Sequence, residues 1–122
     1  MYRELHILQA NIKKITEVQH ALHNDTALAK SHFILGQEPN CFLTEGQVIL
    51  PGTNPRWAKF IPSMTRQGPH PVRSCMWASR DLAVTQLYAD SPGATTVVAQ
   101  VNHRKLLVVS AYIPSKHAER TN

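Results

Sequence analysis

One segment constrains the fold more than any other: two short apolar runs flank a stretch with helical periodicity. Residues 5–12 suit a β-strand, and because their apolar side chains do not alternate cleanly we expect a strand buried on both faces. Residues 13–30 carry apolar residues at three-, four- and seven-residue steps among polar ones, which predicts an amphipathic helix. Residues 31–37 form the second apolar run. Together they predict a βαβ unit whose two strands are parallel.

The remainder of the chain has the pattern of loops and strands. Six of the eight prolines lie between positions 39 and 71, which predicts a loop-rich stretch with short strands at 47–50 and 57–61. Apolar or β-branched runs follow at 74–79, 83–88, 95–102 and 106–113. Short turn-like links join these runs, so we expect antiparallel hairpins. The predicted fold class is mixed α/β or α+β, with one crossover helix.

The charge balance is basic, with 13 Lys and Arg residues against 8 Asp and Glu residues, a net charge of +5. A basic surface attracts polyanions, which fits nucleic acid, a membrane surface or no specific partner. The basic residues are scattered, so the sequence has no basic arm. It has no apolar run near the roughly 20 residues of a membrane span and no signal-peptide pattern. We therefore expect an intracellular protein, nuclear or cytoplasmic, that is not secreted and has no membrane partner.

The cysteines and histidines do not predict a zinc site. Cys41 and Cys75 are far apart and in no CxxC arrangement, so buried free thiols are expected. His20 and His23 lie three positions apart on the predicted helix, but no further ligand has a supporting spacing, so both are expected on the helix surface.

Two polar residues, Asn11 and Glu38, end the two predicted parallel strands. Ligands of open α/β sheets bind outside the carboxyl ends of the strands, so these side chains are expected near each other. Pro39 should stop the strand and hold Glu38 in an extended backbone. A carboxylate there suits Mg²⁺ or Mn²⁺. The alternatives are a solvent-facing carboxylate at Glu38 and a turn or capping residue at Asn11.

Tyr112 lies near the end of the last predicted strand. It is either a half-buried strand tyrosine or a phenol that reaches a phosphate at the same edge. Spacing alone leaves both interpretations open.

Four segments carry a family resemblance. Residues 8–11, residues 34–39 with Gln-Glu-Pro, and residues 108–114 resemble the endonuclease/exonuclease/phosphatase superfamily. Residues 73–82 are similar to its non-LTR retrotransposon (LINE-like) branch. The resemblance implies that residues 1–122 are the N-terminal half of such a domain, within a four-layer α/β sandwich whose C-terminal half is missing.

The resemblance also implies an activity and roles for residues. The activity is metal-dependent hydrolysis of DNA phosphodiesters, in a full-length form fused to a reverse transcriptase. Glu38 resembles the carboxylate that binds the catalytic Mg²⁺, with Mn²⁺ as a substitute. Asn11 resembles the amide beside that metal, and Tyr112 resembles the tyrosine that contacts the scissile phosphate.

The sequence departs from the family pattern in ways that bear on activity. Asn40 stands where tryptophan is frequent and Gly36 where a larger apolar residue is common; both changes are tolerable. The Gly-Asp-Phe-Asn-like and Ser-Asp-His motifs that follow in the family are absent. We therefore expect weak Mg²⁺ binding and little or no activity from this chain alone. The alternatives are a non-enzymatic nucleic-acid-binding module and a non-functional transposon remnant.

The resemblance has one further consequence for the surface. The family fold packs two sheets face to face, and this half is expected to supply mainly one of them. Its inner face would then be an exposed apolar surface, through which the protein could self-associate.

Overall fold

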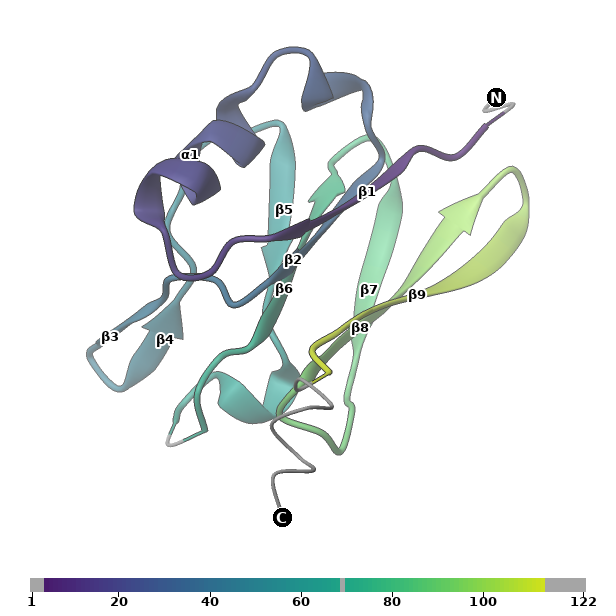
Figure 1. Cartoon of the computed structure of the whole chain (residues 1–122). Coiled ribbons are helices and arrows are strands. Elements are labelled where there is room, and N and C mark those ends of the chain that lie inside the picture. Colours follow the sequence, from purple (N-terminus) through teal and green to yellow (C-terminus); the bar gives the residue numbers. More distant parts are fainter. Residues whose placement is uncertain (1–3, 69, 114–122) are drawn as a thin grey trace.

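A computed structural model describes residues 4–68 and 70–113 as a mixed α+β protein made mostly of strands in three sheets (Figure 1). The strands are β1 (Ile7–Asn11), β2 (Phe33–Gln37), β3 (Phe42–Thr44), β4 (Gln47–Ile49), β5 (Trp57–Phe60), β6 (Ser74–Ser79), β7 (Ala83–Leu87), β8 (Ala94–Val101) and β9 (Arg104–Ala111). The helical elements are α1 (Thr16–Asn24) and the short 3₁₀ turns η1 (Leu28–Lys30) and η2 (Ser63–Thr65). The expected fold class is confirmed.

The first sheet has the strand order β1-β2-β6-β5, and β1 runs parallel to β2 as the βαβ pattern predicted. The prediction that β1 is buried on both faces is wrong. Its residues alternate between exposed and half-buried, and Ile7 is 49% exposed. β1 is the edge strand of the first sheet. The second sheet therefore leaves uncovered the β1 side chains on the face that it packs against, which include Ile7 and Asn11.

The strand buried on both faces is β6, in which all six residues are buried. It lies between β2 and β5 and is antiparallel to both. We expected β6 to form a hairpin with the next strand, and this is wrong: β7 belongs to a different sheet. The intervening turn, where the Leu82 amide donates to the Ser79 carbonyl at 3.1 Å, carries the chain from one sheet to the other.

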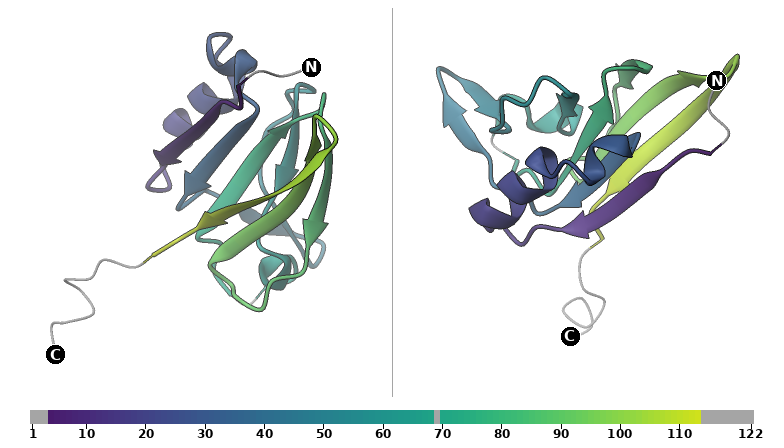
Figure 2. Two further views of the ribbon diagram at one scale, coloured as in Figure 1. Left: turned by 90° about the vertical axis from the view of Figure 1, so that its right-hand side faces the viewer. Right: turned by 90° about the horizontal axis from the view of Figure 1, so that it is seen from above.

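The second sheet, β7-β8-β9, packs on one face of the first sheet, and α1 covers the other (Figure 2). Between the sheets lies an apolar core to which β2, β6, β8 and β9 contribute Phe33, Met76, Val97 and Val108. The expectation that the chain supplies mainly one sheet, with an exposed apolar inner face, is therefore wrong. The hairpins β7–β8 and β8–β9 supply the second sheet and bury that face.

Helix α1 covers 16–24 rather than the predicted 13–30. At its start, Lys13 and Lys14 have φ values of 54° and 59°, in the left-handed region, which excludes them from a right-handed helix. At its end, the Asp25 carboxylate accepts a hydrogen bond from the Ala27 amide at 2.8 Å. Asn and Asp side chains form such turns in competition with the helix, which explains the early stop.

The hairpin β3–β4 was predicted only in part, because β3 was not expected. Its turn is Glu45-Gly46, with φ values of 50° and 77°. Two successive positive φ values are typical of the tight type I′ hairpin turn. Glutamate is a poor indicator of that turn, since Asn or Asp before glycine is the usual signal, and so the hairpin escaped prediction.

A second apolar core lies between α1 and the first sheet and includes Trp57 and Trp77, which are 2% and 0% exposed. Both cysteines are free; Cys75 is buried and Cys41 half-buried. His23 was expected at the surface, and this is wrong: it is 3% exposed and stacks on Trp77 at 5.9 Å. The described part of the chain has no helix that is long and apolar enough to span a membrane.

Candidate functional site

Four segments meet at one edge of the molecule: the ends of β1, β2 and β9 and the residue before β6. The Ile12 amide donates to the Gln37 carbonyl at 2.8 Å, which joins the end of β1 to the end of β2. The Glu38 amide donates to the Arg73 carbonyl at 2.8 Å, which joins the end of β2 to the start of β6. The Gln37 side chain donates to the Ala111 carbonyl at 2.8 Å, which brings in β9. This edge, with Asn11, Glu38, Arg73 and Tyr112, is called the site edge below.

The structure thus brings the three residues predicted for the site, Asn11, Glu38 and Tyr112, to the same edge. The Asn11 side-chain oxygen accepts a hydrogen bond from the Lys13 amide at 3.1 Å, so the alternative interpretation of Asn11 as a turn residue is confirmed. The Lys14 amide donates to the Glu38 carbonyl at 2.8 Å. Through this bond the loop that follows β1, which contains Lys13 and Lys14, is joined to the backbone of Glu38.

The backbone at the site edge is strained. Lys13, Lys14 and Glu38 have φ values of 54°, 59° and 52°, and none is glycine. The expectation that Pro39 holds Glu38 in an extended backbone is therefore wrong. Such conformations cost about 1–3 kcal/mol each and collect at functional sites. The hydrogen bonds from Lys14 to Glu38 and from Glu38 to Arg73 hold this loop conformation in place.

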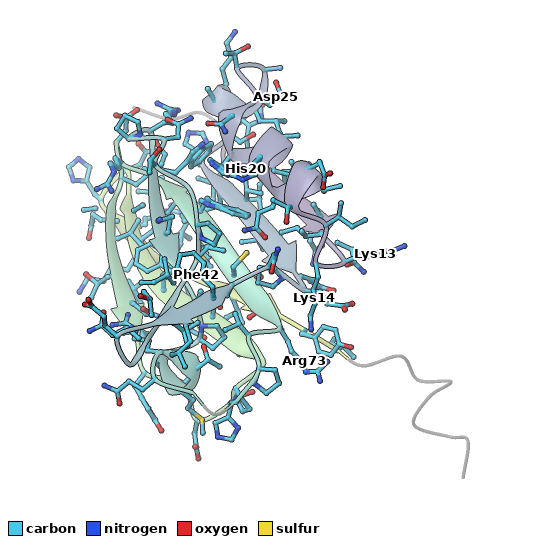
Figure 3. All side chains as sticks on the ribbon, turned by 90° about the vertical axis from the view of Figure 1, so that its left-hand side faces the viewer. Lys13, Lys14, His20, Asp25, Phe42 and Arg73 are labelled. Carbon is cyan, nitrogen blue, oxygen red and sulfur yellow. The ribbon has the colours of Figure 1, made fainter. Side chains whose placement is uncertain are left out.

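Arg73 was not predicted as a site residue. Its guanidinium carbon lies 5.1 Å from the centre of the Tyr112 ring, within the range of a cation–π contact. The Tyr112 amide donates to the Gly93 carbonyl at 2.9 Å, which fixes the tyrosine backbone. Figure 3 shows Lys13, Lys14 and Arg73 together at one end of the sheet. Its place directly before a buried strand indicates an end of the sheet, but not which other strand ends lie beside it.

Polar residues replace the apolar core beneath the site edge. Ser74 and Thr95, both fully buried, share a hydrogen bond of 2.9 Å between their hydroxyl oxygens. The buried Ser110 hydroxyl donates to the Gly36 carbonyl at 3.3 Å. These bonds tie β2 to β9 and β6 to β8, so the two sheets hold a fixed distance under the site.

Gln19 is a second residue that the sequence did not single out. Although it lies on α1, it is only 2% exposed. Its side-chain nitrogen donates to the Asn40 carbonyl at 3.0 Å, and its oxygen accepts from the Asn40 amide at 2.7 Å. The Asn40 side chain donates to the Thr16 hydroxyl at 2.8 Å. Helix α1 therefore holds the segment that follows Glu38.

The donor set that the described residues supply at the site edge is too small to hold Mg²⁺ by itself. Glu38 is half-buried, and its carboxylate has no hydrogen bond or ion pair to the residues that the structure describes. Among residues 4–68 and 70–113, no group of three or more His, Cys, Asp or Glu side chains could hold a metal ion. Mg²⁺ takes six oxygen ligands, so phosphate and water would have to supply most of them.

Comparison with known proteins supports the fold. No family model matches the chain, and no curated protein matches it. Among solved structures, the chain is similar to the endonuclease domain of TRAS1, a telomere-specific non-LTR retrotransposon, with a TM-score of 0.64 and 23% identity. The match covers 95% of this chain and 48% of that domain, so the chain spans about half its length. The resemblance to non-LTR retrotransposon endonuclease domains is thereby confirmed at the level of the fold.

Proposed function

We propose that the site edge binds the phosphate backbone of DNA, as part of a domain that hydrolyses DNA phosphodiesters. The observation that carries this proposal is the convergence of Asn11, Glu38, Arg73 and Tyr112 on one edge, next to two lysines. The fold shared with a retrotransposon endonuclease domain supports the same activity class. The net charge of +5 supports a polyanionic partner.

Each side chain has a role that its chemistry suggests. Arg73 supplies a guanidinium that can bind two phosphate oxygens, and the Tyr112 ring restrains it. Lys13 and Lys14 add positive charge at the same end of the sheet. The Tyr112 hydroxyl and the Asn11 amide are the neutral hydrogen-bonding groups. All of these bind and orient the phosphate.

We further propose that Glu38 is the protein ligand for a weakly bound Mg²⁺ or Mn²⁺. Such an ion would stabilise the negative charge that develops on a phosphate during hydrolysis. Because Glu38 is the only carboxylate we assign to it, this chain alone should bind the ion only together with DNA. We also propose that the full-length form is fused to a reverse transcriptase, as the retrotransposon origin of the similar domain suggests.

For the chain on its own, DNA binding is the activity that the geometry supports best. Among residues 4–68 and 70–113, the site edge contains no histidine or second carboxylate that we can assign as a general base, and loss of that group typically lowers a rate by about 10²–10⁴. A non-enzymatic binding module is therefore the second candidate, favoured by the basic residues Lys13, Lys14 and Arg73 at the same end of the sheet. The third possibility, a transposon remnant without function, requires that even DNA binding is absent.

Nicking of supercoiled plasmid by the purified 122-residue chain tests these candidates. We expect DNA binding that weakens steeply with salt, and at most slow nicking that requires Mg²⁺ and disappears in Glu38→Gln. The matched control is Glu17→Gln, an exposed position on α1.

The outcomes separate the candidates. Mg²⁺-dependent nicking that Glu38→Gln abolishes would exclude the non-enzymatic module. Absence of nicking with intact DNA binding would favour it. A folded chain that does not bind DNA at all would overturn the proposal and leave the remnant.

A further inference from the structure

A groove of about 360 Å³ opens directly beside the site edge. One wall is the hairpin β3–β4, with Phe42 and Leu43, and the other is the segment around His70. Lys14 stands at the end nearest Glu38, and Asn40 continues the lining from there. The groove is therefore continuous with the site edge along the chain.

The chemistry of the groove lining combines an exposed aromatic ring with positive charge. Phe42 is 50% exposed and Leu43 is 65% exposed, although neither residue has a polar atom in its side chain. The described residues that line the groove include one lysine and one histidine but no aspartate or glutamate. Burial raises the pKa of the Cys41 thiol to about 11, so this part of the lining is uncharged at neutral pH.

We infer that this groove binds the base of an unpaired nucleotide next to the phosphate held at the site edge, with Phe42 as the stacking platform. The inference rests on the proposed function, because the site edge must first place the nucleic-acid backbone. The groove volume of about 360 Å³ lies in the range of small-ligand sites, about 300–1,000 Å³. Proteins bind single-stranded nucleic acid without reading its sequence through a positively charged groove in which bases stack on aromatic side chains.

The spacing along the chain allows this arrangement. Phe42 follows Glu38 by four residues, which span at most about 14 Å when extended. Gln19 fixes the intervening Asn40 through two hydrogen bonds of 2.7 and 3.0 Å, so the groove keeps its position relative to Glu38. The Val48 amide of the hairpin donates to the carbonyl of Arg66, the residue after η2, at 2.7 Å, which holds the hairpin in place.

Fluorescence anisotropy with short single-stranded DNA tests the groove. Two oligonucleotides of equal length are compared, one with all bases and one with abasic sugars at every position. For the first, Phe42→Ala should weaken binding about tenfold, because a stacked base contributes that order of affinity. For the abasic strand, the same substitution should change the affinity less than twofold, since the phosphates remain.

Further variants separate the effect of base stacking from a loss of folding and from nonspecific apolar binding. Phe42→Tyr should keep the affinity, and Phe42→Leu should lose it although the side chain stays apolar. The matched control is Tyr88→Ala, an exposed aromatic residue (73%) after β7 in the other sheet, which should bind both strands as the wild type does.

Four results would overturn the inference. Equal losses for the two strands, or no loss in Phe42→Ala while wild-type binding is strong, would show that the groove does not bind a base. A Phe42-dependent affinity for phosphatidylserine vesicles with unchanged affinity for DNA would assign the hairpin to a membrane surface. Failure of the wild type to bind either strand would instead refute the proposed function itself, and the inference with it.

Discussion

The Glu38 amide donates a hydrogen bond of 2.8 Å to the carbonyl of Arg73, the residue whose guanidinium lies over the Tyr112 ring. This contact joins the backbone of the acidic residue of the site edge, Glu38, to the backbone of its arginine, Arg73. In this arrangement Glu38 has a left-handed φ of 52°, which is a strained conformation for a residue other than glycine. The same relationship makes the account testable at several positions.

The two hydrogen bonds between Gln19 and Asn40, here called the clamp, should be important for stability. Gln19→Leu leaves the Asn40 amide and carbonyl without their buried partner, and we expect the free energy of unfolding to fall by about 2 kcal/mol. Urea denaturation measures this change. Gln100→Leu, an exposed position on β8, is the control and should change it by less than about 0.5 kcal/mol. Equal effects of the two substitutions would show that the clamp contributes nothing.

Gly36 should not tolerate a larger side chain. A Cβ atom there would lie 2.7 Å from the Cys75 sulfur and 2.9 Å from a methyl carbon of Ile12. We expect Gly36→Ala to destabilise the protein by about 1–3 kcal/mol, with partial recovery in the double variant that adds Cys75→Ala. Gly93→Ala is the control, since its nearest neighbour would be an ordinary 3.5 Å away. Thermal unfolding of the four proteins decides the matter, and an unchanged Gly36→Ala would contradict the packing described.

Stability should fall as the pH drops below about 6.5, the ordinary pKa of histidine. Burial lowers the pKa of His23 in the folded state, and the bond from its ring Nδ1 to the Gln19 carbonyl opposes this only in part. Burial also lowers the pKa of His32. The unfolded chain therefore takes up protons in this range that the folded chain does not, so the free energy of unfolding rises with pH.

Urea denaturation at pH 7.5 and pH 5.5 measures this dependence. His23→Gln should reduce the difference between the two pH values, whereas His103→Gln, an exposed position between β8 and β9, should keep it. A difference that is the same in His23→Gln as in the wild type would assign the pH dependence to other groups.

The sequence predicted the βαβ unit, every strand position except β3, and the proximity of Asn11 and Glu38. The position of Tyr112 at the same edge was one of two interpretations that it left open. These features depend on local periodicity and on where strands end, which a single sequence shows. It did not predict that Ile7 and Asn11 lie on an edge strand, or that β6 and β7 separate into two sheets. Which strand is central depends on contacts between distant segments, and an apolar run has the same local pattern in either place.

The site residues that escaped prediction have the same explanation. Gln19 has the pattern of a polar residue on the outer face of a helix, yet it is buried because the segment at Asn40 folds over it. Arg73 becomes a site residue only because β6 pairs antiparallel with β2, which places its start beside the end of β2. The left-handed φ of Lys13, Lys14 and Glu38 has no signal in residue type, since none of them is glycine or asparagine.

The charge of Glu38 should have opposite effects with and without a divalent ion. In EDTA its carboxylate repels a bound phosphate, so Glu38→Gln should bind duplex DNA about two- to fivefold more tightly than the wild type. With millimolar Mg²⁺ the wild type should gain affinity and Glu38→Gln should gain less, because it lacks the ligand. Anisotropy titrations in both buffers test this, with Glu17→Gln as the control. Identical behaviour of all three proteins would mean that Glu38 faces solvent without a role.

The most direct test of the phosphate-binding site edge is the salt dependence of DNA affinity for Arg73→Ala compared with Arg104→Ala. Both arginines are exposed, but Arg104 begins β9 and so lies at the opposite end of that strand from Tyr112. We predict that Arg73→Ala weakens binding and lowers the slope of log affinity against log salt by about 1, the loss of one phosphate contact, while Arg104→Ala leaves the slope unchanged. Equal slopes for the wild type and Arg73→Ala, or a loss confined to Arg104→Ala, would contradict the account.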